Sequence, residues 1–231
     1  MTPLNTIAHI RSDFPTKFGV PRQSGLVETL QAKIIFAEKY RRPEALRGLE
    51  TFSHIWLLWG FSQSKAGDWS PTVRPPRLGG NTRIGVFATR SPYRPNSIGL
   101  SCVKIEKIDL QSPVGPILHV LGADLTDGTP IYDIKPYLPY TDSHPEASGG
   151  FAAEHSAAPL HVRLDNRWPA LLPAESAQTL HDLLAHDPRP SYQQDPARVY
   201  GLEYKGLEVK FSVDGDILTV LSVEPRAAAP D

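Results

Sequence analysis

The residues with the clearest capacity for chemistry lie in one stretch, GVFATRSPYRPNSIGLS, at positions 85–101. It places Arg90 and Arg94, with several hydroxyl groups and an asparagine, between two apolar segments. Pro92 and Pro95 each hold φ near about −65° and stiffen the chain between those segments. Because the planar fork of arginine matches carboxylates, phosphates and base edges, this stretch favours an anionic ligand. A capped surface turn with solvated arginines is the alternative interpretation.

Charge is distributed unevenly along the chain. Its 231 residues include 24 lysines and arginines against 25 aspartates and glutamates. Between Trp69 and Ile105, however, there is no acidic residue. The basic residues in that window are Arg74, Arg77, Arg83, Arg90, Arg94 and Lys104. A local excess of positive charge in a nearly neutral protein predicts a surface that binds an anionic partner.

Composition restricts the class of protein. The 23 prolines and 17 glycines predict short strands and shaped loops. Cys102 is the only cysteine and the histidines show neither HxH nor HExxH spacing, so we expect no disulfide and no metal site. The longest strongly apolar run, IWLLW at 55–59, is too short to cross a bilayer, and the first residues lack the apolar core of a signal peptide. We therefore expect a cytoplasmic protein without membrane contact.

The first part of the chain has the pattern of a strand-rich domain. Strands are predicted at 6–11, 32–37, 52–61, 100–108, 115–125 and 131–140. Residues 85–88 and 98–101 are expected to be strand ends that flank a loop at 89–97. One or two helical turns are predicted at 43–49. A turn is expected at 126–129, since Asp-Gly is a strong hairpin signal.

The second part of the chain has a different pattern. Residues 141–159 are poor in apolar side chains and are predicted to be a linker between domains at 1–140 and 160–231. After it we expect a strand at 160–164, a helix at 173–186 and a β-meander at 199–223. A second proline-stiffened loop, residues 187–192, follows the helix and carries Arg189. The overall prediction is a mainly β protein with a small α+β C-terminal domain.

Several common catalytic motifs are missing. The chain has no GxGxxG after a strand, no GxxxxGK[ST] and no GxSxG. These absences disfavour a Rossmann enzyme, a P-loop nucleotidase and an α/β-hydrolase. A phosphoester hydrolase is disfavoured because it needs clusters of carboxylates and histidines to hold metal ions.

Six segments, in order along the chain, carry a family resemblance. They read PRQ at 21–23, LETFSHIWLL at 49–58, PTVRPPRLGGN at 71–81, GVFATRSPYRPNSIGLS at 85–101, DLTDGTPIYDIKPYLPY at 124–140 and DPRPSY at 187–192. With them the chain resembles the TrmO/TsaA-like proteins, which are S-adenosylmethionine-dependent tRNA methyltransferases that methylate N6 of threonylcarbamoyladenosine next to the anticodon. Ser97 stands where the family often has proline and Thr126 where an aliphatic residue is common, and neither departure removes a charge.

The resemblance implies a fold, a cofactor and an assembly. The fold would be a non-Rossmann β-barrel methyltransferase domain, and the protein would be a homodimer whose C-terminal domain helps to bind tRNA. The family pattern implies that S-adenosylmethionine contacts Pro21, Arg22, Gln23, Ser62, Gln63, Arg90, Leu100, Asp124, Leu125, Thr126, Asp127, Gly128 and Thr129. A pocket formed by loops at the mouth of a barrel agrees with this distribution.

The reaction also needs groups that handle the substrate. N6 must lose a proton, and Asp133 is the first candidate to accept or orient it, with Tyr132 second. An ion pair between Asp133 and Lys135 on the same strand face is an equally open interpretation. The expected substrate contacts at the anticodon loop are Arg94, Asn96, Lys135, Arg189 and Tyr192.

A different class of function explains part of the same pattern. A non-catalytic nucleotide- or RNA-binding β-barrel would also have stiff basic loops and a window without acidic residues. Binding of S-adenosylmethionine together with methyl transfer separates the two hypotheses.

Overall fold

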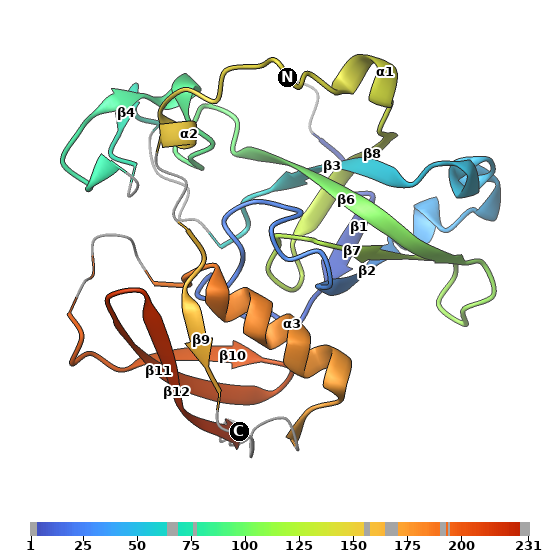
Figure 1. Ribbon diagram of the computed structural model, residues 1–231. Helices are drawn as coiled ribbons and strands as arrows, with labels where there is room; N and C mark the ends of the chain where they lie inside the picture. The colour runs from blue at the N-terminus through green and yellow to red at the C-terminus, as the bar shows by residue number, and fades with distance from the viewer. Residues whose placement is uncertain are drawn as a thin grey trace.

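The computed structural model describes residues 4–63, 69–75, 78–154, 158–164, 171–189, 193 and 195–226. Its first part is a closed barrel of antiparallel strands in the order β1-β2-β7-β6-β3-β8 (Figure 1). The strands are β1 (Ala8–Arg11), β2 (Gln31–Phe36), β3 (His54–Gly60), β6 (Ile98–Asp109), β7 (Ile117–Leu121) and β8 (Pro130–Pro136). A mainly β protein with an N-terminal barrel is therefore confirmed.

The barrel core consists of buried side chains that alternate with exposed ones along the strands. In β2, Ala32, Ile34 and Phe36 are buried while Gln31 and Lys33 are exposed. Successive side chains of a strand point to opposite faces, so every second residue enters the barrel. The buried side chains of the other strands meet there, including Ile10, Ile55, Leu57, Leu118 and Ile131.

The second part packs one helix on a four-stranded sheet. The sheet has the order β10-β11-β12-β9, with β9 (His161–Arg163) parallel to β12 (Ile217–Pro225). The strands β10 (Tyr200–Tyr204) and β11 (Leu207–Asp214) complete the predicted meander. The helix α3 (Ala174–Ala185) buries Leu180, Leu183 and Leu184 in the same core as Phe211. Ala177 on the same helix is only half-buried.

The remaining elements are short. The segment predicted as a linker contains α1 (Pro139–Asp142) at its start and α2 (Phe151–Glu154). Two two-residue strands, β4 (Thr72–Val73) and β5 (Ile84–Gly85), pair with each other. Turns of 3-10 helix lie at Glu38–Tyr40, Pro43–Leu46, Leu49–Thr51 and Val86–Ala88.

Three local predictions are wrong in whole or in part. Residues 86–88 form a 3-10 turn, not a strand end, because β5 stops at Gly85. The turn expected at 126–129 is present, with the N–H of Thr129 donating to the carbonyl of Thr126 at 3.2 Å, but it does not join a hairpin. Among the described strands, β7 pairs with β2 and β6, and β8 pairs with β1 and β3. Closing the barrel requires this separation of β7 from β8. The strand expected to reach residue 140 ends at Pro136, and Pro139 begins α1.

One irregular segment connects the two parts. Residues 12–30 contain no helix or strand, yet Phe14, Val27 and Leu30 are buried in the core of the C-terminal sheet and α3. In Figure 1 this segment, coloured blue, lies between the barrel and α3. The first loop of the barrel thus contributes its buried side chains to the core of the C-terminal part.

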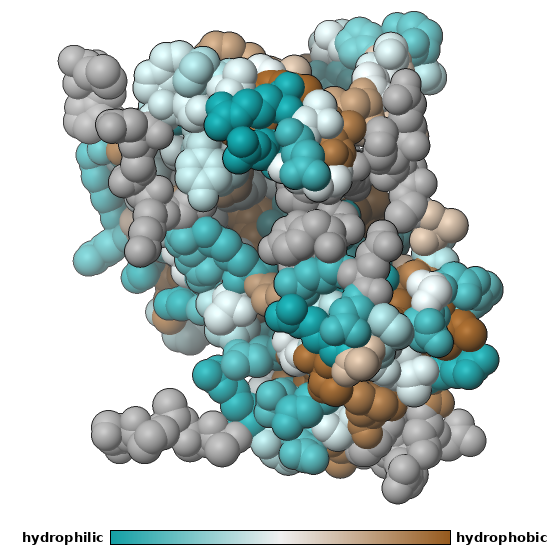
Figure 2. Space-filling view, turned by 90° about the vertical axis from the view of Figure 1, so that its left-hand side faces the viewer, coloured by the Kyte–Doolittle hydropathy of each residue, from teal (hydrophilic) through white to brown (hydrophobic). Residues whose placement is uncertain are grey.

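The surface is mixed in character. The face shown in Figure 2 is largely hydrophilic, and its hydrophobic residues form several separate groups. Within the described ranges, no helix has the length and apolar character needed to cross a membrane.

Candidate functional site

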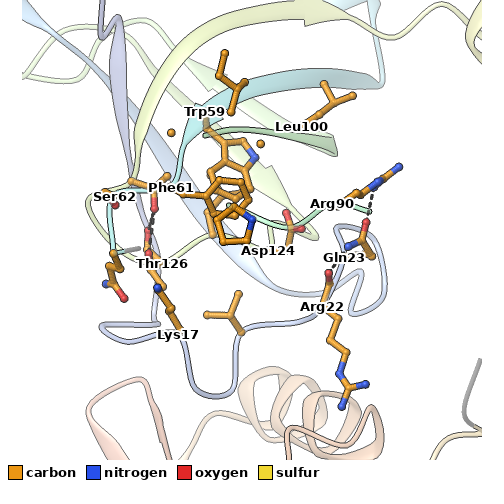
Figure 3. Close-up of a pocket in the computed structure, with 18 of the residues that line it drawn as sticks. Lys17, Arg22, Gln23, Trp59, Phe61, Ser62, Arg90, Leu100, Asp124 and Thr126 are labelled. Carbon is orange, nitrogen blue, oxygen red and sulfur yellow. Dashed lines mark hydrogen bonds between the residues drawn. The ribbon is translucent and has the colours of Figure 1, made fainter. Parts of the chain in front are cut away.

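A pocket of about 570 Å³ lies at one end of the barrel (Figure 3). Four segments form its wall: the loop at 17–23, the end of β3 with residues 61–63, the 89–100 segment, and the connection at 124–129. Of the expected cofactor contacts, those in the wall are Pro21, Arg22, Gln23, Ser62, Gln63, Arg90, Leu100, Asp124, Leu125, Thr126 and Thr129. The pocket brings together segments that are more than 100 residues apart in the sequence.

Trp59, Ser101 and Asp124 form a series of hydrogen bonds at the pocket. Trp59 Nε1 donates to Ser101 Oγ at 2.9 Å, and Ser101 Oγ donates to Asp124 Oδ1 at 2.5 Å. Burial raises the pKa of Asp124 above its ordinary value, while the bond from Ser101 and the charge of Arg90 act in the opposite direction. Asp124 therefore places a partly buried carboxyl group, oriented by neighbours, at the pocket wall.

Gly99 leaves room for Trp59, the first residue in this series of hydrogen bonds. Gly99 lies opposite Trp59 in the β3–β6 pairing. A Cβ atom at position 99 would come within 2.3 Å of Trp59 Cε2. The ring of Phe61 packs on the other side, with ring centroids 4.4 Å apart. Trp59 thus packs against Gly99 and Phe61 while its N–H donates to Ser101.

The proline-stiffened loop fixes its own conformation. Arg94 Nη1 donates to the carbonyl of Thr89 at 2.9 Å, and Ser97 Oγ donates to the carbonyl of Pro92 at 2.9 Å. Arg90 donates from Nη1 to Oε1 of Gln23 on the facing loop. Of the two arginines, Arg94 braces the loop while Arg90 bridges it to the 17–23 loop.

The residues of the connection at 124–129 have two different roles. Thr126 and Thr129 line the pocket, and their hydroxyl groups lie 3.0 Å apart. Asp127 and Gly128 are not among the lining residues. Instead Asp127 accepts from the backbone N–H of Ser12 and from Arg11 Nη1, each at 3.1 Å. Asp127 thus fastens the end of β1, a role that its place in a shared motif did not indicate.

The expected proton acceptors lie outside the pocket wall. On β8, Asp133 Oδ2 forms an ion pair with Lys135 Nζ at 2.8 Å; the Lys135 side chain is exposed and that of Asp133 is half-buried. The ion-pair interpretation of Asp133 is the one that this geometry shows. Tyr132 lies against Gly60, where a Cβ atom would be 2.2 Å from the tyrosine oxygen. The catalytic roles of Asp133 and Tyr132 stay predictions.

The expected substrate contacts are dispersed. Asn96 and Arg94 line the pocket, whereas Arg189 does not. The side chain of Arg189 is 11% exposed, and its guanidinium donates to both carboxylate oxygens of Asp187, at 2.8 and 3.0 Å. Tyr192 lies outside the described residues.

The sequence reasoning missed part of the wall. Lys17, Trp59, Phe61 and Ile98 also line the pocket. The three apolar residues belong to strand-like runs and resemble core residues. Their position at the ends of β3 and β6, beside the basic loop, was the available signal. Among the described residues there is no group of three or more His, Cys, Asp or Glu side chains arranged to hold a metal ion.

The wall is suited to S-adenosylmethionine. The volume lies in the range of about 300–1,000 Å³ that is typical of small-molecule sites. Leu100 and Val20 supply apolar surface, Asp124 supplies a carboxylate for a cation or for hydroxyl groups, and Arg90 supplies a cation for a carboxylate. The residues present therefore fit the charges and the apolar base of this cofactor.

Both parts of the chain match family models. Residues 9–143 match the tRNA-methyltransferase O N-terminal domain, and residues 157–226 match the TrmO C-terminal domain. The chain belongs to the TrmO family. This confirms the resemblance that the six sequence segments carry.

Curated relatives of this TrmO-family chain agree with the family assignment. A tRNA (adenine(37)-N6)-methyltransferase of Escherichia coli is 41% identical over 95% of this chain and 97% of the relative. A protein of the same name from Eikenella corrodens is 45% identical over 75% of this chain and 97% of its own. A putative S-adenosylmethionine-dependent methyltransferase of Pseudomonas aeruginosa is 38% identical over 95% of this chain and 96% of its own.

Solved structures show the same architecture. A crystal structure of TrmO superposes with a TM-score of 0.78 at 33% identity, covering 97% of this chain and 99% of the other. A crystal structure of TrmO from Pseudomonas aeruginosa gives 0.75 at 32% identity, covering 96% of this chain and 98% of the other. The likeness extends over the barrel and the C-terminal part together.

Proposed function

We propose that this protein transfers the methyl group of S-adenosylmethionine to N6 of adenine 37 of tRNA. The observation that carries the proposal is the pocket at the barrel end, where Asp124 and Arg90 lie on a partly apolar wall. The proposal is supported by relatives with this printed name that align over nearly the whole chain. The cytoplasm, where tRNA is processed, is the compartment that we infer.

The pocket residues have separable tasks in this proposal. S-adenosylmethionine supplies a methyl group activated by its own sulfonium charge, so the protein mainly positions and shields the reactants. Asp124 offers negative charge, and Ser101 keeps its carboxylate in place. Arg90 and Gln23, which are hydrogen-bonded to each other, close one side of the wall. These groups together orient the ligand against the pocket wall.

We propose that the specific substrate is a threonylcarbamoyl-modified adenine and that two sets of residues contact it. Arg94 and Asn96 lie at the pocket edge, where a threonyl carboxylate would be bound by an arginine fork. Asp133 is proposed to accept the N6 proton, with Tyr132 second. Asp133 would have to release Lys135 in order to do so, because the two form an ion pair.

We also propose a homodimer that binds the tRNA anticodon loop. Large apolar side chains are exposed at Leu100 in the pocket wall and at Phe87 and Tyr93, which are close to lining residues in the sequence. Exposed aromatic and aliphatic side chains of this kind are common where another chain or an unstacked base is bound. Light scattering on the purified protein measures its mass and distinguishes one copy from two.

One experiment tests the proposed reaction against the non-catalytic alternative. The protein is incubated with S-adenosylmethionine labelled in its methyl group and with tRNA that carries, or lacks, the threonylcarbamoyl group at adenine 37. We expect label in the modified tRNA, located at N6 by mass spectrometry of the nucleosides. Cofactor binding without label in either tRNA would contradict methyl transfer and favour a binding protein.

A further inference from the structure

The segment at residues 14–25, called the cofactor loop below, has no regular secondary structure. It nevertheless contributes Lys17, Val20, Pro21, Arg22 and Gln23 to the pocket wall. An irregular loop can keep a binding geometry only if contacts outside the loop hold it, since ordering it during binding costs conformational entropy. The part of the molecule that makes these contacts therefore controls the geometry of the pocket wall.

The base of the cofactor loop is anchored in the C-terminal core. Phe14 is buried there, and its ring lies 6.3 Å from that of Tyr204. Gly19 has φ of +89°, and a Cβ atom at this position would come within 2.0 Å of Leu202 Cδ1. Just beyond the loop, Thr179 Oγ1 on α3 donates to Thr29 Oγ1 at 2.9 Å. The C-terminal part therefore supports the loop along its length.

Arg22 adds a polar connection at the pocket itself. Its Nη2 donates to the carbonyl oxygens of Asp187 and Arg189, at 3.3 and 2.8 Å. Figure 3 shows the Arg22 side chain extending away from the pocket, toward the C-terminal part. The guanidinium of Arg22, for which the family resemblance implies a cofactor contact, thus also bonds to the C-terminal part.

The turn that receives Arg22 is itself rigid. Asp187 adopts φ of +49°, a left-handed conformation that aspartate tolerates better than most residues. Its carboxylate accepts from the Nε and Nη2 atoms of Arg189 at 2.8 and 3.0 Å. The Asp187–Arg189 pair therefore aims two carbonyl groups at Arg22. We call residues 187–189 the clamp turn.

The opposite edge of the cofactor loop contacts the barrel. Gln23 accepts from Arg90, and Gln63 Nε2 donates to the carbonyl of Pro15 at 3.0 Å. A shift of the loop away from the clamp turn would therefore displace Gln23, and with it Arg90, from the pocket wall.

We propose that the C-terminal part positions the cofactor loop, and that Arg22 is the positioning residue that transmits this support from the clamp turn. The proposal rests on the proposed function, because the ligand whose affinity depends on the loop is S-adenosylmethionine. It assigns the C-terminal part a role in cofactor binding, separate from any contact that it makes with tRNA.

The test removes the clamp turn's ion pair without altering a pocket residue. Dissociation constants for S-adenosylmethionine are measured by calorimetry on the full chain and on its Asp187→Ala and Asp187→Asn variants. We expect Asp187→Ala to weaken binding by about tenfold, the scale of one missing charge-assisted hydrogen bond, and Asp187→Asn to weaken it less. Asparagine keeps one acceptor for Arg189 and also tolerates positive φ. Graded losses in this order support the clamp.

Arg226→Ala is the matched control. It removes another ion pair of the C-terminal part, between Arg226 Nη1 and Glu203 Oε2 at 2.9 Å, far along the sequence from the clamp turn. This variant should bind S-adenosylmethionine as the unaltered chain does. Unchanged affinity in Asp187→Ala, or equal losses in Asp187→Ala and Arg226→Ala, would overturn the proposal.

A double-mutant cycle separates positioning from direct contact. If Arg22 acts through the clamp turn, Arg22→Ala combined with Asp187→Ala should be hardly weaker than Arg22→Ala alone. Losses that multiply would show that Arg22 contacts the cofactor itself. Hydrogen exchange at residues 14–25 should be faster in Asp187→Asn, and unchanged exchange would also contradict the proposal. Absence of S-adenosylmethionine binding by the unaltered chain would instead contradict the proposed function.

Discussion

Two aspartates three positions apart show how differently neighbouring residues of one motif are used. Asp124 lies at the pocket wall and accepts from Ser101, whereas Asp127 accepts from the backbone of Ser12 and fastens β1. The carboxyl group of Asp124 carries a raised pKa because it is buried. The raised pKa of Asp124 indicates a cost to folding, which its proposed role in ligand binding explains, while Asp127 stabilises the fold.

Asp124→Asn should weaken S-adenosylmethionine binding by about tenfold or more, since a hydrogen bond to a charged group typically contributes about 1.5–3 kcal/mol. The melting temperature at neutral pH should not fall. A raised pKa means that the folded state holds the proton more tightly than the unfolded state, so ionisation of Asp124 lowers stability as pH rises above 3.8. Asparagine removes that loss. Calorimetric titration and thermal melts on one preparation measure both quantities.

Asp127→Asn is the paired variant. Its expected effect is the reverse: a lower melting temperature with S-adenosylmethionine affinity nearly unchanged, because the substitution weakens the bonds that Asp127 accepts from Arg11 and Ser12. If Asp124→Asn instead loses stability and keeps its affinity, the assignment of Asp124 to the ligand is wrong.

Among the elements, β3 and β6 have the greatest influence on the pocket. Their pairing sets Trp59 opposite Gly99, and the pocket opens where both strands meet loops. Because β6 begins at Ile98, the basic loop before it is held by an extended strand with partners on two sides. The arginines are thus presented by a loop on a rigid support.

Gly99→Ala should be strongly unfavourable. The added methyl group would come within 2.3 Å of Trp59, which must then move and release Ser101. We expect a decrease of about 1–3 kcal/mol in the free energy of unfolding. Denaturant titration measures this decrease, and weaker cofactor binding should accompany it.

Gly85→Ala provides the comparison at the other end of the same stretch. Nothing lies within 4 Å of a Cβ atom there, and φ is −58°. This variant should keep both stability and affinity. A similar loss in both variants would mean that the effect of Gly99→Ala does not arise from the contact with Trp59.

For the whole molecule, the distribution of charge matters more than its sum. The formal net charge is −1, so general attraction to a polyanion is weak. The exposed Arg74, Arg83 and Arg90 lie in a part of the chain without acidic residues, next to the pocket segments. Association with tRNA should therefore depend on this local group of cations.

We expect the tRNA dissociation constant to rise steeply with salt. Each phosphate neutralised contributes a log–log slope of about −0.9 to the association constant on duplex and about −0.7 on a single strand. Arg74→Gln combined with Arg83→Gln should flatten the slope, whereas Arg47→Gln, an exposed arginine outside the window, should leave it unchanged. Fluorescence anisotropy at several salt concentrations measures the slopes, and an equal slope in all variants would exclude this surface.

The sequence by itself determined what depends on neighbours along the chain. The alternation in β2, the strand at β3, the helix α3 and the stiff loop around Arg90 and Arg94 were all predictable, because backbone preference and side-chain period act locally. The ordered motifs also identified the family. Which residues shared the barrel end followed only from that resemblance.

The tertiary structure decided the pairings between distant residues. Closing the barrel kept β7 from pairing with β8, so the Asp127-Gly128 turn joins no hairpin, and Thr126 and Thr129 on either side of it line the pocket. It also brought Trp59 to Asp124 through Ser101, and Arg22 to the clamp turn 165 residues away. Such contacts depend on how whole strands and cores pack, which no local pattern encodes. Arg22, for which the family resemblance implies a cofactor contact, lines the pocket and also donates to two carbonyl groups of the clamp turn.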